Sequence, residues 1–249
     1  MRVERKTPNH NKAHNRKKWG YALAVLLFLV VLLGKSESVM EAESTRIYQV
    51  YCLGDSITYG SGLSQEMRPL ACYPAQLQEL LGAKYRVMNY GVSGRTLTDV
   101  PERSYRDTGY LDMVKMQSPD ILVVMLGTND SKEDVWDAQR YQEEYVALVE
   151  ELQAIESEPD IYLMIPPEAF PYEDGVIVYG INNDIIHDEI RHIVRTVSEE
   201  TGAGLIDLYA VTENHPEYFV DGVHPNEQGY EVLTKAVYEQ IVEDRGIVK

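Results

Sequence analysis

Apolar runs of strand length recur along the chain from residue 47 onward. Each run is separated from the next by enough residues to form a helix. The runs predict five strands, at Ile47–Leu53, Tyr85–Tyr90, Ile121–Leu126, Ile161–Ile165 and Gly204–Leu208.

Apolar residues also recur at steps of three and four between and after these strands, which is typical of helices with one buried face. The three clearest stripes are Tyr145, Leu148, Val149, Leu152 and Ile155; Ile186, Ile190, Ile193, Val194 and Val197; and Tyr230, Leu233, Val237 and Ile241. Alternating strands and helices favour a parallel sheet covered on both faces. We therefore expect an α/β fold, a three-layer α/β/α sandwich around a five-stranded parallel sheet.

The N-terminal part has a different pattern. Residues 19–34 (WGYALAVLLFLVVLLG) carry no charge, and seven basic residues precede them within residues 1–18. This order is typical of a membrane-targeting segment whose positive side stays in the cytoplasm. As a helix the run would measure about 24 Å, which suits either a transmembrane signal-anchor or a signal-peptide core.

We favour an uncleaved anchor, because no small-x-small cleavage site follows the apolar run. The expected organisation is a basic cytoplasmic segment at 1–18, an N-terminal hydrophobic helix at 19–34, a polar linker at 35–46 and one domain at 47–249. The domain would lie outside the cytoplasm, membrane-anchored if the helix is kept and secreted if it is cleaved.

The charge of the chain is unevenly distributed. The whole sequence has a formal net charge of -17, yet residues 1–40 are basic, so the remainder carries a net charge of -23. An acidic body repels phosphate groups and anionic lipid headgroups. A nucleic-acid partner and a peripheral role on an anionic membrane surface are therefore disfavoured.

Only two cysteines are present, Cys52 and Cys72, and no cluster of Cys and His has metal-ligand spacing. We therefore predict no metal site. Cys52 lies in an apolar run, as buried thiols usually do, while a disulfide between the two cysteines is the alternative in an oxidising compartment.

The first candidate for chemistry follows the first strand, in Gly54-Asp55-Ser56. A Ser just past a strand end can project its hydroxyl into the crevice at the sheet edge, where ligands bind in open α/β sheets. Alternatively, Asp55 or Ser56 caps the next turn. Two other motifs are excluded: a P-loop needs Gly-Lys-Ser/Thr here, and an α/β-hydrolase elbow needs Gly where Thr58 stands.

Two further segments end predicted strands with possible hydrogen-bond donors. They are Asn89–Gly94 after the second strand and Gly127–Asp130 after the third. An Asn side-chain amide, such as that of Asn129, and a Gly backbone N–H, such as that of Gly94, are fixed dipoles of the kind that stabilises a developing oxyanion. Alternatively, Asp130 caps the next helix and Gly94 only serves a turn.

The fourth segment is Asp221-Gly222-Val223-His224-Pro225, before the last predicted helix. A carboxylate three residues ahead of an imidazole can turn back to its Nδ1–H, which leaves Nε2 free as a general base.

Together the four segments resemble the SGNH hydrolase (GDSL-like lipase/esterase) family. The matching blocks, in order, are Gly54-Asp55-Ser56, Ser93-Gly94, Gly127-Thr128-Asn129-Asp130 and Asp221-Gly222-Val223-His224-Pro225. The resemblance implies a flavodoxin-like fold for the domain at 47–249 and a serine esterase that needs no cofactor. It also implies catalytic roles for Ser56, Asp221 and His224, and an oxyanion hole formed by Ser56, Gly94 and Asn129.

The four blocks leave the substrate open. We expect a short-chain, acetyl-like ester on an extracytoplasmic carbohydrate or envelope polymer, with the loops Ser61–Cys72 and Pro166–Gly180 as candidate walls. The second loop contains Phe170, Tyr172 and Tyr179, which could stack on a sugar or line an acyl groove, or simply pack the loop. A lysophospholipase or acyl thioesterase is the alternative enzyme. A non-catalytic glycan-binding envelope protein is the alternative from another class.

Overall fold

The computed structural model describes residues 46–246. The predicted basic segment, the apolar helix and all but the last residue of the linker fall outside these residues, so they stay predictions. Within residues 46–246, none of the helices combines the length and the apolar character needed to cross a membrane.

Five parallel strands form one sheet in the order β2-β1-β3-β4-β5. They are β1 (Tyr48–Gly54), β2 (Tyr85–Gly91), β3 (Ile121–Met125), β4 (Asp160–Ile165) and β5 (Gly204–Asp207). The five-stranded parallel sheet is confirmed, and every strand end lies within one residue of its predicted position. β2 lies on one side of β1, whereas β3, β4 and β5 follow one another on the other side. The strand order therefore reverses between β1 and β3, and their carboxyl ends form a topological switch point.

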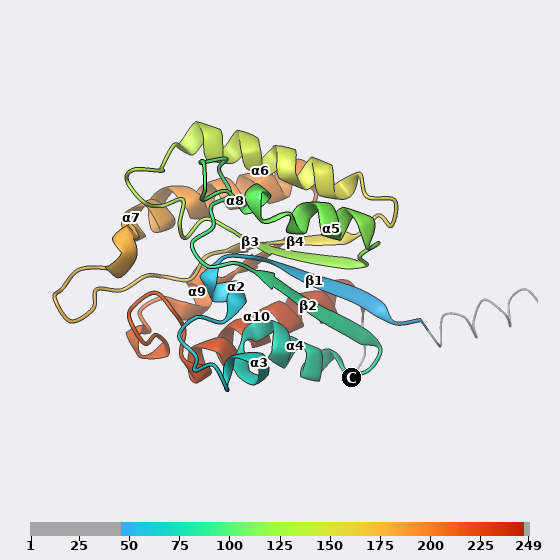
Figure 1. The fold of residues 1–249 in the computed structure, drawn as a ribbon, viewed down its shortest axis with the longest axis horizontal. Coiled ribbons are helices and arrows are strands. Elements are labelled where there is room, and N and C mark those ends of the chain that lie inside the picture. The colour runs from blue at the N-terminus through green and yellow to red at the C-terminus, as the bar shows by residue number, and fades with distance from the viewer. Residues whose placement is uncertain (1–45, 247–249) are drawn as a thin grey trace, which may run out of the picture. The chain divides into compact units, whose positions relative to one another are not determined.

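Helices cover both faces of the sheet (Figure 1). On one face lie α4 (Tyr73–Leu81) and α10 (Glu227–Asp244); on the other lie α5 (Tyr110–Met116), α6 (Ala138–Gln153) and α8 (Arg191–Thr201). Alternate residues of β1 and β3 point to opposite faces and enter two separate apolar cores, one with α4 and α10 and one with α5, α6 and α8. The expected three-layer arrangement is therefore present in the described residues.

All fourteen residues of the three predicted apolar stripes are buried. The helices that carry them begin and end at recognisable signals. Asp137 caps α6 through Arg140 N, Asn226 caps α10 through Gly229 N, and α8 ends at Gly202, whose φ is 74°. Ahead of α8, the short helix α7 (Asn183–Ile185) and a π-helical turn, η3 (Ile186–Ile190), carry the first part of the second stripe.

Several short elements lie outside the predicted pattern. They are α2 (Ser56–Tyr59), α3 (Arg68–Ala71), α9 (Leu208–Thr212), η1 (Tyr105–Thr108), η2 (Val178–Gly180) and η4 (Pro216–Tyr218). Leu208, expected at the end of a strand, is instead the first residue of α9, because Asp207 caps a helix at that point. Cys52 and Cys72 are both buried and both free thiols.

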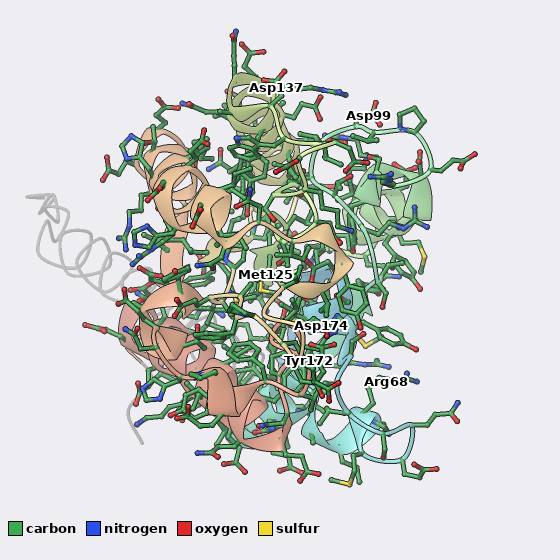
Figure 2. The ribbon with its side chains drawn as sticks, turned by 90° about the vertical axis from the view of Figure 1, so that its left-hand side faces the viewer. Arg68, Asp99, Met125, Asp137, Tyr172 and Asp174 are labelled. Carbon is green, nitrogen blue, oxygen red and sulfur yellow. The ribbon has the colours of Figure 1, made fainter. Side chains whose placement is uncertain are left out.

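Figure 2 shows Met125 of β3 in the interior of the molecule, whereas Asp99 and Asp137 lie at its periphery. The apolar side chains of the two cores therefore lie between the sheet and the helices. Polar side chains such as Asp55, Ser56 and Asn129 follow the carboxyl ends of β1 and β3.

Candidate active site

The turn after β1 places Ser56 at the first position of α2. Only glycine fits at residue 54, since a Cβ there would lie 2.2 Å from Thr58 Oγ1 and 2.6 Å from Met125 O. Asp55 then caps the helix, its Oδ1 accepting a hydrogen bond of 2.9 Å from Ile57 N. The capping alternative is therefore correct for Asp55, and the cap holds the neighbouring Ser56 at the carboxyl end of the sheet.

The segment before α10 is organised around the carboxylate of Asp221. Its Oδ1 accepts hydrogen bonds from Val223 N at 3.0 Å and His224 N at 2.7 Å, and its Oδ2 lies 2.7 Å from His224 Nδ1. Gly222 makes this tight loop possible with a φ of 83°. The carboxylate thus fixes both the backbone and the ring of His224, and it holds the Nδ1 side of the imidazole.

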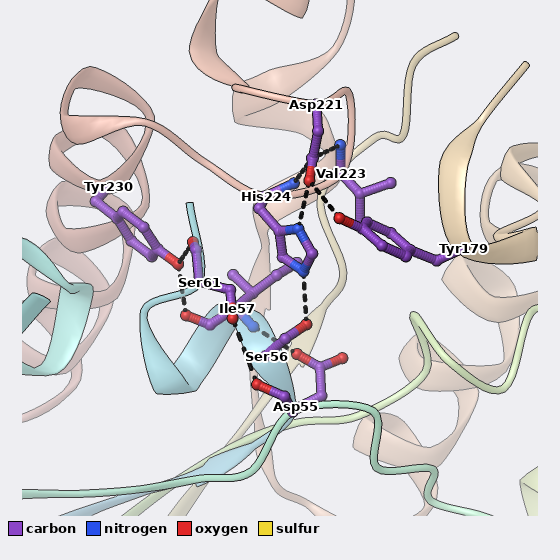
Figure 3. A network of polar contacts seen from close by, with 10 residues as sticks. Asp55, Ser56, Ile57, Ser61, Tyr179, Asp221, Val223, His224 and Tyr230 are labelled. Atoms are coloured by element: carbon purple, nitrogen blue, oxygen red, sulfur yellow. Dashed lines mark hydrogen bonds and ion pairs between the residues drawn. The ribbon is translucent and has the colours of Figure 1, made fainter. Parts of the chain in front are cut away.

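The other imidazole nitrogen, Nε2 of His224, lies 3.0 Å from Ser56 Oγ although 168 residues separate the two positions (Figure 3). Helix α10 helps to join these distant parts of the chain. The buried hydroxyl of Tyr230, in α10, shares its one hydrogen between Ile57 O within α2, at 3.0 Å, and Ser61 O just after α2, at 2.7 Å. The structure therefore brings Ser56, His224 and Asp221 into one continuous hydrogen-bonded chain.

A pocket of about 220 Å³ opens at Ser56 and His224, and both Gly94 and Asn129 line it. Gly94 has a φ of 78° with no atom within 4 Å of an added Cβ, so its glycine serves the backbone conformation. Asn129 uses one amide hydrogen on Arg95 O, at 3.1 Å, and has a second to offer. The first N–H groups of a helix lack intrahelical acceptors, which leaves Ser56 N available as a third donor.

Asp130 does not cap a helix, so that alternative is wrong; Asp137 caps α6 instead. The buried carboxylate of Asp130 accepts from Leu97 N at 2.9 Å, and from Thr98 N at 2.9 Å and Thr98 Oγ1 at 2.7 Å. It therefore braces the segment that follows Gly94. The sequence motif contains Asp130 but does not indicate this role, because the contact joins the segments that follow β2 and β3.

Burial acts differently on the three carboxylates of the site. It raises the pKa of Asp55 and of Asp130 to about 6, partly offset by the backbone hydrogen bonds that each accepts. Burial also acts on Asp221, but the hydrogen bonds from His224 and from the backbone outweigh it and hold the pKa of Asp221 below its usual range. Asp221 is therefore the carboxylate that stays ionised beside the imidazole.

The two candidate wall loops contribute unequally. From the first, Ser61 lines the pocket at Ser56. In the second, Phe170 is buried against Phe219, with ring centroids 5.4 Å apart, and Tyr172 is exposed. Tyr179 lines the pocket and donates a hydrogen bond to Asp221, a contact that no sequence pattern signalled.

Within the described residues, no group of three or more His, Cys, Asp and Glu side chains is placed to hold a metal ion. What the site offers instead is a hydroxyl, an imidazole and a carboxylate in line, beside amide donors. This arrangement can activate an oxygen nucleophile and stabilise a developing negative charge next to it.

The sequence matches the GDSL-like Lipase/Acylhydrolase family over residues 52–232. It is similar to an acetylxylan esterase of Xylanibacter ruminicola, 33% identical over 209 residues that cover 76% of this chain and 42% of that protein. It is also similar to an acetylxylan esterase of Geobacillus stearothermophilus, 28% identical over 68% of this chain and 80% of that protein. A multidomain esterase of Ruminococcus flavefaciens is 26% identical, and the chain spans 32% of its length.

Solved structures show the same fold. The aryl esterase of M. smegmatis superposes with a TM-score of 0.66 at 22% identity, covering 81% of this chain and 100% of that one. A carbohydrate acetylesterase from Sinorhizobium meliloti superposes with a TM-score of 0.65 at 19% identity, covering 79% and 99%. With the family match over most of the domain, these findings establish that the chain belongs to the GDSL-like lipase/acylhydrolase family, the SGNH hydrolases, and is a carboxylic ester hydrolase.

Proposed function

We propose that this esterase removes short acyl groups, acetyl-like in size, from a carbohydrate or cell-envelope polymer outside the cytoplasm. The observation that carries the proposal is the combination of a small pocket at the Ser56 hydroxyl with a much larger cleft beside it, whose wall has both hydrogen-bonding and apolar side chains. The names of two relatives as acetylxylan esterases support the same substrate class.

The pocket at Ser56 limits the acyl group. Its volume of about 220 Å³ is below the range of about 300–1,000 Å³ that drug-sized ligands occupy. Three of the residues that line it, Asn129, Ile181 and Val223, are buried. An acetyl group fits such a space, whereas a long fatty acyl chain would have to leave it.

The adjoining cleft, of about 790 Å³, shares Lys132, Tyr179 and Ile181 with the pocket. Its wall carries two kinds of side chain. The charged and amide ones are Arg103, Lys132, Glu133, Asp134, Asn182, Asn183 and Asp184, and the apolar ones are Pro171, Val176, Ile177, Tyr179 and Ile181. Hydrogen-bonding groups of this kind suit the hydroxyls of a sugar better than an alkyl chain, which favours a glycan over a lysolipid as the carrier of the ester.

In the proposed reaction Ser56 is the nucleophile. His224 Nε2 takes the proton of Ser56 Oγ as the oxygen attacks the ester carbonyl, and Asp221 holds the imidazole and stabilises its positive charge. The tetrahedral intermediate then collapses, the C–O bond to the alcohol breaks, and His224 gives its proton to the leaving sugar oxygen. Water repeats the same steps on the acyl-Ser56 ester and releases the carboxylic acid.

The negative charge of the tetrahedral intermediate falls on the former carbonyl oxygen. Ser56, Gly94 and Asn129 all line the pocket in which that oxygen would lie, and we assign their two backbone N–H groups and the second amide hydrogen of Asn129 as its donors. Asp130 contributes indirectly, because it braces the residues that follow Gly94. Donors held in this way stabilise the charge without having to reorganise as it forms.

The location outside the cytoplasm is part of the proposal. It is supported by the basic residues 1–18 followed by the uncharged run 19–34, which also motivate the domain division at residues 18, 34 and 46. Protease accessibility of the domain on intact cells tests it: digestion from outside is the expected result, and protection until lysis would contradict it.

The substrate is tested with the purified chain on two series. Among 4-nitrophenyl esters, we expect kcat/KM to fall steeply from acetate to octanoate, because the pocket cannot hold the longer chain. Among natural carriers, we expect acetate release from acetylated xylan and little hydrolysis of lysophosphatidylcholine or an acyl thioester. Preference for octanoate together with lysolipid hydrolysis would replace the proposal with the lysophospholipase alternative, and inactivity on every ester would favour a glycan-binding role.

A further inference from the structure

Tyr179 makes a direct contact with the carboxylate of the triad. Its hydroxyl donates a hydrogen bond of 3.1 Å to Asp221 Oδ2, the same oxygen that lies 2.7 Å from His224 Nδ1 (Figure 3). Tyr179 is largely exposed, but partial desolvation and this hydrogen bond both raise its pKa, so its hydroxyl stays protonated and remains a donor. Asp221 Oδ2 is therefore shared between the imidazole and a second donor from another part of the chain.

The ring of Tyr179 also meets the imidazole. Its centroid lies 5.2 Å from that of His224, with 60° between the ring planes, an edge-to-face arrangement. To reach this position the backbone of Tyr179 adopts the left-handed conformation, with a φ of 61°, and Gly180 follows with a φ of 70°. Such a conformation is uncommon for a residue with a side chain, and it persists where the surroundings hold it.

The segment that carries Tyr179, residues 170–181, is tied at both ends to the parts of the site. At one end Phe170 N donates to Gly222 O at 2.8 Å, inside the loop of Asp221 and His224. At the other, Ile181 is buried and the next residue, Asn182, donates its N–H to Ser131 Oγ at 3.1 Å, just after the Asn129 segment. Between these ties, Pro171, Val176, Ile177 and Tyr179 line the cleft of about 790 Å³.

From these contacts we propose that Tyr179 is a positioning residue of the reaction, whose hydroxyl and ring hold Asp221 and His224 in line with Ser56. Because Tyr179 also lines the substrate cleft, it connects the wall of that cleft to Asp221 and His224. The inference rests on the proposed roles of Asp221 and His224. The inference adds Tyr179, from the loop that follows β4, to the residues that contact Asp221 and His224.

The hydrogen bond has a chemical consequence beyond support. By donating to Oδ2, Tyr179 shares the negative charge of Asp221 with the imidazole. Without the hydroxyl the carboxylate would attract the Nδ1 proton of His224 more strongly, so the substitution changes the electrostatics of the Asp221–His224 pair as well as its packing. The other charged groups near the imidazole are Asp55, whose charge acts on it, and Lys132, which lines the same pocket; neither changes when the Tyr179 hydroxyl is removed.

The test compares Tyr179→Phe, which removes only the hydroxyl, with Tyr172→Phe. Tyr172 lies on the same segment, and its side chain is exposed with no hydrogen bond from its hydroxyl among the described residues. Both variants and the unaltered chain are assayed for kcat and KM on 4-nitrophenyl acetate from pH 5 to 9. Thermal melts establish that each variant is folded.

For Tyr179→Phe we expect kcat to fall about three- to tenfold, the range that a single hydrogen bond supports, with KM unchanged. The acid limb of its kcat/KM profile should move to higher pH, a change that a merely structural role would not produce. Tyr172→Phe should match the unaltered chain. Equal kcat and superimposable pH profiles for both variants would overturn the inference.

A third variant separates this inference from the function on which it rests. Asp221→Asn should lower kcat by roughly a thousandfold or more if Asp221 has its proposed role. If Asp221→Asn is as active as the unaltered chain, the proposed mechanism fails. If Asp221→Asn is inactive while Tyr179→Phe behaves like Tyr172→Phe, the mechanism stands and only the role of Tyr179 is rejected.

Discussion

The hydroxyl of Tyr230 lies 3.0 Å from the carbonyl oxygen of Ile57, and the two residues are 173 positions apart. The bond joins α10, which begins just after His224, to α2, which begins with Ser56. This hydrogen bond therefore connects α2 and α10, the first and last helices of the described residues, which begin at Ser56 and just after His224, the two residues proposed to exchange a proton.

The first prediction concerns this fastening. Tyr230→Phe keeps the buried ring but removes both hydrogen bonds of the hydroxyl, and it leaves the Ser61 carbonyl without that donor. We expect the free energy of unfolding to fall by about 1–2 kcal/mol. Urea denaturation measures it. Tyr59→Phe, in α2 and partly exposed, is the control and should change little; equal effects of the two substitutions would contradict the prediction.

The second prediction concerns pH and Asp55. The pKa of Asp55 is raised to about 6, because burial outweighs the hydrogen bonds from Ile57 and Thr128. The folded state thus binds this proton more tightly than the unfolded chain does. The carboxyl therefore adds stability as the pH falls from about 7 towards 4, by roughly 1 kcal/mol between pH 7 and 5.

Asp55→Asn tests this because Asn can keep the cap on Ile57 N while carrying no charge. We expect the variant to be more stable than the unaltered chain at pH 7 and to gain less stability on acidification. Asp130, whose pKa is also raised to about 6, keeps its own contribution in both proteins. Urea denaturation at pH 7 and pH 5 measures the free energy of unfolding of both proteins. If Asp55→Asn gains as much stability at pH 5 as the unaltered chain does, the prediction is wrong.

The third prediction compares two glycines with similar backbones. Gly222 has a φ of 83° and Gly202 has a φ of 74°, so alanine is strained at both. Only at Gly222 would the new Cβ collide, at 2.1 Å from Phe170 O; at Gly202 nothing lies within 4 Å. Gly202→Ala should cost about 1 kcal/mol of stability and leave kcat unchanged. Gly222→Ala should lower kcat at least tenfold by displacing Asp221 and His224; similar activities would argue against this.

The fourth prediction concerns Asn129. If its amide stabilises the oxyanion, Asn129→Ala should lower kcat by about a hundredfold or more while KM changes little. The same substitution also removes the hydrogen bond to Arg95 O. A melt recorded beside the kinetics therefore shows whether the segment after Gly94 has loosened. A kcat within twofold of the unaltered chain would exclude Asn129 from the oxyanion hole.

Much of the fold could be predicted because its elements carry repeating patterns. The central strand β3 is a continuous run of buried apolar residues, and the long helices α6 and α10 show buried stripes at helical spacing. Short elements such as α2 and α9 have no room for such a pattern. They depend on single capping residues, Asp55 and Asp207, whose effect is local and easily mistaken for a turn.

The candidate site divides in the same way. Ser56, Asp221 and His224 could be nominated because each lies in a short motif at a predicted strand end or loop. The bracing by Asp130 and the contact of Tyr179 with Asp221 could not, since each joins segments more than thirty residues apart. No local sequence pattern predicts that Tyr179 adopts a left-handed backbone conformation, because glycine is the residue that usually adopts it.

The most direct test of the account is covalent labelling of Ser56. The purified chain is treated with a fluorophosphonate, its intact mass is measured, and the modified peptide is sequenced, in parallel with Ser56→Ala. We predict one added phosphonyl group, located on Ser56, together with loss of 4-nitrophenyl acetate turnover. The folded Ser56→Ala variant should show neither label nor turnover. A Ser56→Ala variant that keeps its turnover, or a label on another residue, would contradict the proposal that Ser56 is the nucleophile.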